Sequence, residues 1–431
     1  MSVELLAMVG MLFLLAGIGM PIAYAIIVAS MSYMLVSGTS IGIVGKTLVD
    51  GIYQSFLLLA VPLFIVASNI MNAGTISDRL LGFCVATVGR FKGGLGHVNV
   101  MASLIFSGMS GSAVADAAGI GKIIIEMMRK DGRFPAGYAA AITAASATIG
   151  PIIPPSIPMV LYALISNASI GALFLGGIMP GLLMGAVLMA MNWWISHRRG
   201  FATEDPVALR DLPNVTGRAF PALLMPAILL YGIYGGVTTP TEAAAVAAAY
   251  ALLLSAFFYR SLKLRTLYSI LVESARSSAA VGIVIGSALI LNYIVASENI
   301  PAALATYLND VDVSPLVFLL AVNVLILGLG CLLDATTIIL VIVPLFIPTC
   351  NLLGIDLVHF GVVIVVNCMI GLITPPYGIL LFVINAITGI PLRDIIGEVV
   401  PFLLVLVGAL LAITVFPGIV LFLPRLLGYE G

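Results

Sequence analysis

The chain has 431 residues, of which 61% are hydrophobic and only 9% are charged. Because about a quarter of the residues in an ordinary soluble protein are charged, this composition excludes a soluble globular domain. The 18 Lys and Arg residues nearly balance the 19 Asp and Glu residues, so no basic surface indicates binding to nucleic acid. The four cysteines and three histidines lack metal-ligand spacing, and no zinc or haem site is expected.

The first expected membrane crossing lies within 1–36, an apolar stretch without the basic start of a cleaved signal peptide. The tract 134–197 contains no Asp, Glu, Lys or Arg and must hold more than one span, since about 20 apolar residues cross a bilayer. Further charge-free tracts cover 313–333, 335–355, 357–392 and 399–424. They are rich in Leu, Ala, Ile and Val without the alternation of a barrel strand. The sequence therefore predicts an all-α polytopic protein of a phospholipid membrane.

Basic residues mark the expected cytoplasmic side. By the positive-inside rule, short basic segments lie in the cytoplasm. They occur at 129–133, 197–199 and 260–265. We therefore predict that the polar stretch 201–219 is a cytoplasmic connection between two membrane repeats, 1–200 and 220–431.

Two Pro-Pro motifs interrupt the apolar tracts. They read GPIIPPSIP at 150–158 and GLITPPYG at 371–378, and their first glycines lie 221 positions apart. In lipid, an irregular backbone is possible only where protein or a water-filled cavity satisfies its polar groups. Matching interruptions in two halves of a chain are typical of the substrate site of a secondary transporter.

Each break follows a segment of small residues that ends in an aspartate. These segments read SGMSGSAVAD at 107–116 and GLGCLLD at 328–334. The repeated order argues for a duplicated unit, and it predicts a hairpin plus a broken helix at about 95–165 and again at about 315–390.

The two units are predicted to bind sodium, a hard cation that prefers oxygen ligands. Unwound carbonyls, hydroxyls and one carboxylate per site would supply them. A carboxylate deep in a membrane is functional by default, although capping of a hairpin helix is the alternative for each aspartate. The candidate ligands are Ser110, Ser112, Asp116, Gly150 and Pro154 for the first site, and Asp334, Thr337, Thr374 and Pro375 for the second.

The helices that resume after the breaks would direct partial positive charge at an anionic substrate. The predicted substrate-binding residues are Pro155, Ser156 and Pro376, and capping of the resuming helix is an equally good interpretation for Ser156. Glu273 and Arg276 lie one turn apart and are expected to pair on a helix surface.

No enzymatic activity is expected. The chain lacks a GxxxxGK[ST] phosphate loop, which disfavours an ATP-driven pump. An intramembrane aspartyl protease is a weaker alternative, because the Tyr-Asp and Gly-x-Gly-Asp motifs are not found around Asp116 or Asp334.

The motifs SGSAVAD at 110–116, GPIIPPSIP and GLITPPYG, together with VPLF at 61–64, resemble the large membrane subunit (DctM-like) of the tripartite ATP-independent periplasmic (TRAP) transporters. The resemblance covers essentially the whole chain. It implies an inverted-repeat, elevator-type fold of the ion transporter superfamily, with about eleven transmembrane helices and two re-entrant hairpins. By this resemblance, Ser110, Asp116 and Asp334 would be hairpin residues that bind sodium.

The resemblance also implies a function and partners. The chain would import an organic acid, such as a C4-dicarboxylate, sialic acid or a sugar acid, through the bacterial inner membrane on a sodium gradient. A small four-span membrane subunit (DctQ-like) and a periplasmic substrate-binding protein (DctP-like) would complete the transporter. The alternative is a stand-alone sodium-coupled anion symporter of the same superfamily.

Overall fold

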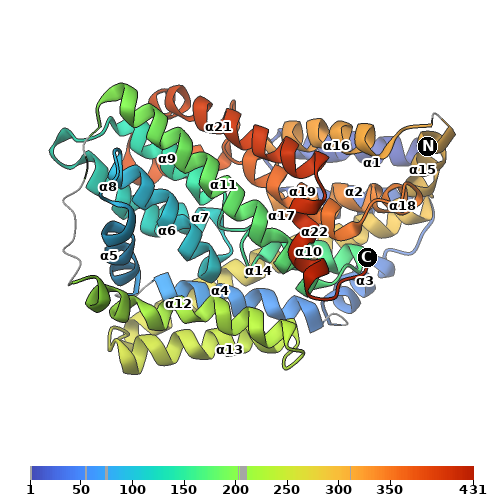
Figure 1. The fold of residues 1–431 in the computed structure, drawn as a ribbon. Coiled ribbons are helices and arrows are strands. Elements are labelled where there is room, and N and C mark those ends of the chain that lie inside the picture. The colour runs from blue at the N-terminus through green and yellow to red at the C-terminus, as the bar shows by residue number, and fades with distance from the viewer. Residues whose placement is uncertain (1, 54–55, 73–75, 202, 204–210, 311) are drawn as a thin grey trace.

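The computed structural model describes residues 2–53, 56–72, 76–201, 203, 211–310 and 312–431. All regular elements in these ranges are helices, which confirms the predicted all-α class (Figure 1). Five helical segments of the described residues are long and apolar enough to cross a membrane. They are α11 (Ile170–Arg199), α12 (Leu212–Tyr234), α13 with its continuation η4 (Pro240–Phe258), α14 (Leu264–Ser297) and α21 (Leu392–Val415). Other apolar helices are shorter or broken, and the total of about eleven spans stays a prediction.

Two corresponding series of elements form the centre of the molecule. The first consists of α6 (Gly94–Ser110), α7 (Ala113–Asp116), the π-helical η2 (Ala117–Gly121), α8 (Lys122–Arg129), η3 (Lys130–Gly132), α9 (Ala136–Ala147), α10 (Ile157–Ser166) and α11. The second consists of α16 (Pro315–Gly330), α17 (Ala335–Thr337), the π-helical η5 (Ile338–Ile342), η6 (Val343–Leu345), α18 (Ile347–Leu352), α19 (Leu357–Gly371), α20 (Ile379–Thr388) and α21. The two π-helical turns begin 221 positions apart, at Ala117 and Ile338, which is also the spacing of the Pro-Pro motifs.

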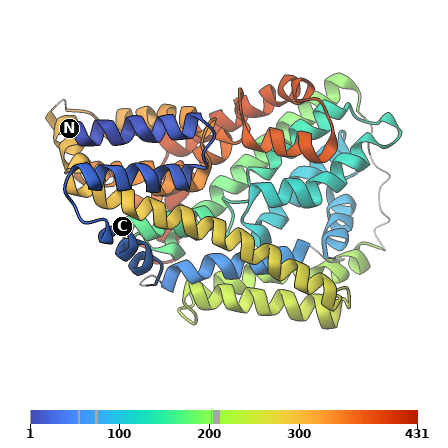
Figure 2. The ribbon, with the colours of Figure 1, turned by 180° about the vertical axis from the view of Figure 1, so that it is seen from behind.

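The two hairpins enter the molecule from opposite ends. In Figure 1, α6 and α8 lie on the left, α16 and α18 lie on the right, and the short helices α7 and α17 lie between them. The long helix α14 crosses the molecule diagonally behind them, as Figure 2 shows. The remaining helices are α1 (Val3–Gly17), α2 (Ile22–Val36), α3 (Gly42–Tyr53), η1 (Phe56–Leu59), α4 (Ala60–Asn72), α5 (Ile76–Val88), α15 (Ile300–Asp310) and α22 (Gly418–Leu426).

The ends of α8 and α11 and the start of α14, which adjoin the three basic segments, lie toward the same end of the molecule (Figures 1 and 2). This arrangement is the one that the positive-inside rule requires. Of the predicted connection 201–219, residues 202 and 204–210 lie outside the described residues.

Buried amides join the first leg of each hairpin to the first part of the following broken helix. In the first series, the side-chain amide of Asn99 donates to Oγ1 of Thr143 at 2.6 Å. In the second, Nδ2 of Asn367 donates to the carbonyl and side-chain oxygens of Asn323, both at 2.9 Å. Asn323 in turn donates to Oγ1 of Thr414 on α21 at 2.8 Å. These bonds fix hairpin and broken helix to each other in both series.

We predict that Asn323→Ala lowers the free energy of unfolding by about 1–3 kcal/mol, because it removes two buried hydrogen bonds, one from Asn367 Nδ2 to the Asn323 side chain and one from that side chain to Thr414 Oγ1. The measurement is thermal unfolding of the detergent-solubilised protein. The matched control is Val324→Ala on the adjacent, 75% exposed position. Equal unfolding temperatures for the two variants would contradict the prediction.

Candidate functional site

A cavity of about 430 Å³ is lined by both hairpin tips. The first tip contributes 110–115, and the second contributes Asp334, Ala335 and Thr336. Residues within both Pro-Pro motifs also line it, among them Pro151 and Leu372. Residues of α4, α14, η2, α19 and α20 form the rest of the wall. Four segments that the sequence pattern singled out therefore meet at one place, although they are up to 260 positions apart along the chain.

The first predicted sodium site has a compact core. Asp116 at the end of α7 is 2% exposed, and Oγ of Ser110 donates to its Oδ1. Its other oxygen, Oδ2, is buried without a hydrogen-bond partner in the described part of the chain. The carboxylate lies against the Cα of Gly150, since a Cβ at that position would collide with Oδ2. The structure thus brings together Ser110, Asp116 and Gly150, and it leaves one carboxylate oxygen available to a cation.

The other two candidates of the first site lie at the contact between the hairpin tip and the break. Ser112 is the N-cap of α7, and its hydroxyl accepts from the backbone N–H of Ala115 at 3.4 Å. Gly111 before it has a φ of +61°, and a Cβ there would collide with the carbonyl oxygen of Pro155. Only glycine therefore allows the tip to rest on the loop that contains Pro154, whose peptide bond to Pro155 is cis.

In the second site, Asp334 is the N-cap of α17. The backbone N–H of Thr337 donates to its Oδ2 at 3.1 Å, and the Thr337 hydroxyl donates to its Oδ1 at 2.5 Å. Thr374 donates to the carbonyl of Ile370 at 2.8 Å, and no hydrogen bond joins it to Asp334 among the described residues. The peptide bond from Pro375 to Pro376 is cis, as in the first half. Asp334 therefore caps a hairpin helix, which was the alternative interpretation of this aspartate. A further role as an ion ligand stays a prediction.

Among the predicted substrate residues, Ser156 caps the helix that resumes after the break, which is the alternative interpretation that the sequence offered. Its hydroxyl caps α10 by accepting from the N–H of Met159 at 3.2 Å, and it donates to the carbonyl of Pro151. Ser156 is 0% exposed, whereas Pro376 is exposed. Neither these two residues nor Pro155 line the cavity described above. Their contact with substrate stays a prediction.

The sequence analysis missed the wall that α4 and α14 contribute. Ser68 and Asn69 on α4 and Glu273 and Ser277 on α14 line the cavity. The expected pair between Glu273 and Arg276 is wrong, because no ion pair joins these two described residues and Glu273 lies at the cavity instead. An acidic residue one turn from an arginine is an ordinary pattern on helix surfaces, so nothing in the sequence indicated that Glu273 lies at the cavity.

Comparison with known proteins agrees with this architecture. The family model "Tripartite ATP-independent periplasmic transporter, DctM component" matches residues 9–419. The chain belongs to this family. The sialic acid TRAP transporter large permease protein SiaM of Vibrio cholerae is 42% identical over 427 residues, covering 98% of this chain and 100% of that protein. The C4-dicarboxylate TRAP transporter large permease protein DctM of Pseudomonas aeruginosa is 38% identical over 375 residues, covering 87% of this chain and 88% of that protein.

The predicted resemblance to the TRAP large membrane subunit is confirmed, and the chain is an integral membrane protein. The crystal structure of the YdaH transporter of Alcanivorax borkumensis has a similar fold, with a TM-score of 0.63 at 16% identity, covering 86% of this chain and 87% of that chain. A TRAP large permease works within a tripartite system, and its named relatives are permeases rather than enzymes.

We predict that Gly150→Ala reduces transport at least about ten-fold without preventing membrane insertion, because the new methyl group displaces the Asp116 carboxylate at a cost of about 1–3 kcal/mol. The measurement is uptake by reconstituted protein of the acid that the wild type carries. Gly328→Ala on α16 is the control, since a Cβ there meets no atom within 4 Å. Equal uptake by the two variants would refute the role of this contact.

Proposed function

We propose that this TRAP large permease imports an organic acid through the inner membrane on a sodium gradient, after delivery by a periplasmic binding protein and in complex with a small membrane subunit. One observation supports this most directly: the cavity between the hairpin tips is lined by the acidic residues Glu273 and Asp334, and no Lys or Arg occurs among its described lining residues.

This charge pattern matters because the carried molecule is itself an anion. Two acidic residues at the same cavity would repel a bound anion. Bound cations are the simplest source of the missing positive charge, and the N-termini of the hairpin helices add backbone N–H groups. The cavity is therefore suited to an acid only when cations occupy neighbouring positions.

The first site supplies a suitable place for such a cation. Burial of an ionised carboxylate without compensation is costly, and Oδ2 of Asp116 has no partner in the described residues. A sodium ion at this oxygen would balance the charge, with the Ser110 hydroxyl and carbonyls of the loop that begins at Gly150 as further ligands. In the second site, Asp334 and Thr337 would do the same.

We further propose that the hairpins and broken helices move together as one carrier unit past the helices that enclose them. Two features support this. The tip of the first hairpin rests directly on its break, and buried amides tie α6 to α9 and α16 to α19. Elements joined in this way move as a rigid body, whereas the wall formed by α4 and α14 belongs to other elements.

The decisive experiment measures uptake of N-acetylneuraminate and of succinate by proteoliposomes that contain this chain with its small membrane subunit. A sodium gradient and the cognate binding protein are each supplied or omitted. We expect uptake of one of these classes only when both are present. Uptake that ignores sodium would refute the coupling, and uptake without the binding protein would favour the stand-alone symporter instead.

We predict that Asp116→Asn and Asp334→Asn each lower sodium-driven uptake at least about ten-fold, a change of about 1.4 kcal/mol in transition-state free energy. The amide keeps the size of the side chain but removes the charge that would hold sodium. Glu242→Gln is the matched control, because Glu242 caps α13 at Thr239 and glutamine preserves this capping box. Wild-type uptake in both aspartate variants would exclude their role as ion ligands.

A further inference from the structure

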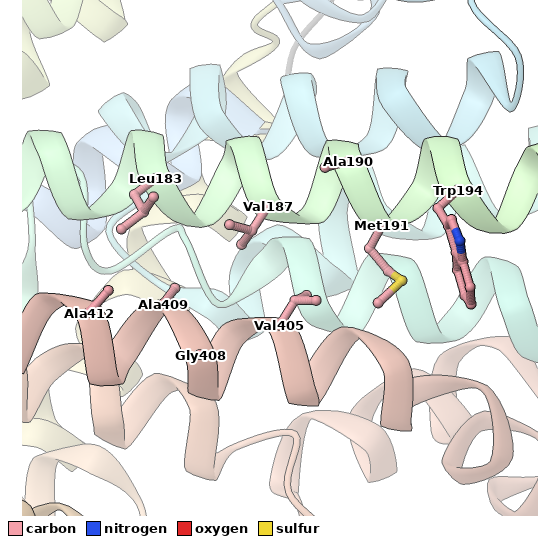
Figure 3. A pocket seen from close by; sticks show the side chains of 9 residues that line it. All are labelled: Leu183, Val187, Ala190, Met191, Trp194, Val405, Gly408, Ala409 and Ala412. Atoms are coloured by element: carbon pink, nitrogen blue, oxygen red, sulfur yellow. The ribbon is translucent and has the colours of Figure 1, made fainter.

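An apolar groove runs along the outer face of the molecule between α11 and α21, with a volume of about 600 Å³. Figure 3 shows Leu183, Val187 and Met191 on one wall. Gly408, Ala409 and Ala412 form the other wall, and their small size makes it recessed. All nine lining residues are apolar. Nearby leucines on both helices are exposed, so this face is suited to contact lipid.

The dimensions of the groove fit one acyl chain. Its wall on α11 extends from Leu183 to Trp194, which is about 16 Å at 1.5 Å per residue. Half of the hydrocarbon thickness of a bilayer is about 15 Å. A transmembrane helix of a partner is about 30 Å long and 10 Å wide, and it would need a longer and wider surface.

One end of the groove carries a cation. Trp194 closes this end, and the guanidinium of Arg198 lies 4.2 Å from the centroid of its ring. Arg198 makes no ion pair with any described carboxylate, whereas its neighbour Arg199 binds Glu398 at 2.7 Å. Tryptophan and arginine together mark the level of lipid headgroups. The groove therefore begins at a headgroup position and continues into the hydrocarbon region.

We propose that this groove binds one anionic phospholipid, with an acyl chain between α11 and α21 and its phosphate at Arg198. The lipid belongs to the leaflet next to the basic segment 197–199. An anionic headgroup is favoured over a zwitterionic one because no carboxylate in the described part of the chain pairs with Arg198, and each arginine near the surface attracts negative lipid.

The experiment uses the tryptophan that closes the groove. The transporter complex is reconstituted into phosphatidylcholine bilayers containing phosphatidylglycerol brominated in the first half of its acyl chains, since bromine quenches indole fluorescence on contact. The chain has two tryptophans, so the signal of Trp194 is isolated by subtracting that of a Trp194→Phe variant. Brominated phosphatidylcholine serves as the comparison lipid.

We expect quenching by brominated phosphatidylglycerol to saturate, with about a five-fold preference over brominated phosphatidylcholine. Arg198→Gln should remove this preference. Gly408→Leu should remove the saturable component of the quenching and leave only the part that rises in proportion to brominated lipid, because the new side chain fills the groove without meeting other atoms within 4 Å of its Cβ. Gly397→Leu, which is equally unhindered and lies on the same helix outside the groove, should behave as the wild type.

Three outcomes would overturn the proposal. Quenching that rises in proportion to the brominated lipid with no preference would indicate ordinary bulk lipid contact. An unchanged saturable component in Gly408→Leu would show that no chain enters the groove. Loss of the small membrane subunit from the Gly408→Leu complex, with Gly397→Leu intact, would identify the occupant as a protein helix.

Discussion

The architecture depends on one constraint, that a break in a helix within a membrane needs other protein to satisfy its backbone. In this chain part of that backbone is satisfied locally, since the N–H groups of Gly150 and Ile152 donate to the carbonyls of Ala147 and Ile149, and the hairpin tips pack closely over the breaks. Gly111 brings the first tip into contact with the carbonyl of Pro155, and in the second half the backbones of Gly330 and Gly371 touch each other. The two hairpins enter from opposite ends and their tips meet in the middle, which is where the cavity forms.

The few charges of the chain follow from the same constraint. The three basic segments lie toward one end of the molecule, where water and headgroups can solvate them, and among the described acidic residues Asp116 at the first hairpin tip is buried. Asp334 obtains two hydrogen bonds from Thr337, but Asp116 keeps an oxygen without a partner. The first site is therefore the stronger candidate for a bound cation. The hydrogen bonds from Thr337 already stabilise the Asp334 carboxylate, whereas one oxygen of Asp116 has no partner among the described residues.

The helical fold class and the positions of the two hairpins and broken helices were predictable from the sequence, since proline pairs and aspartates are conspicuous inside apolar tracts. Their common spacing predicted the duplicated units, and the structure brings Ser110, Asp116 and Gly150 together, while the role of these residues as ion ligands stays a prediction. Contacts made by ordinary residues were not predictable. Asn99 and Asn323, which tie each hairpin to its broken helix, have no sequence signature, and Glu273 resembled half of a surface ion pair. Periodicity identifies which segments are apolar, but it does not say which faces of α4 and α14 meet the cavity.

The outer face formed by α11 and α21 must remain compatible with the surrounding lipid. Helices α11 and α21 end both series, and Arg199 and Glu398 join them at the basic end of the molecule. If the carrier unit moves, this face moves through lipid rather than past protein, so its apolar surface must stay matched to the hydrocarbon at every position. A groove with a cation at one end would hold lipid at a fixed depth on this face. The same two helices would then connect the depth of the carrier in the bilayer to the position of its substrate cavity.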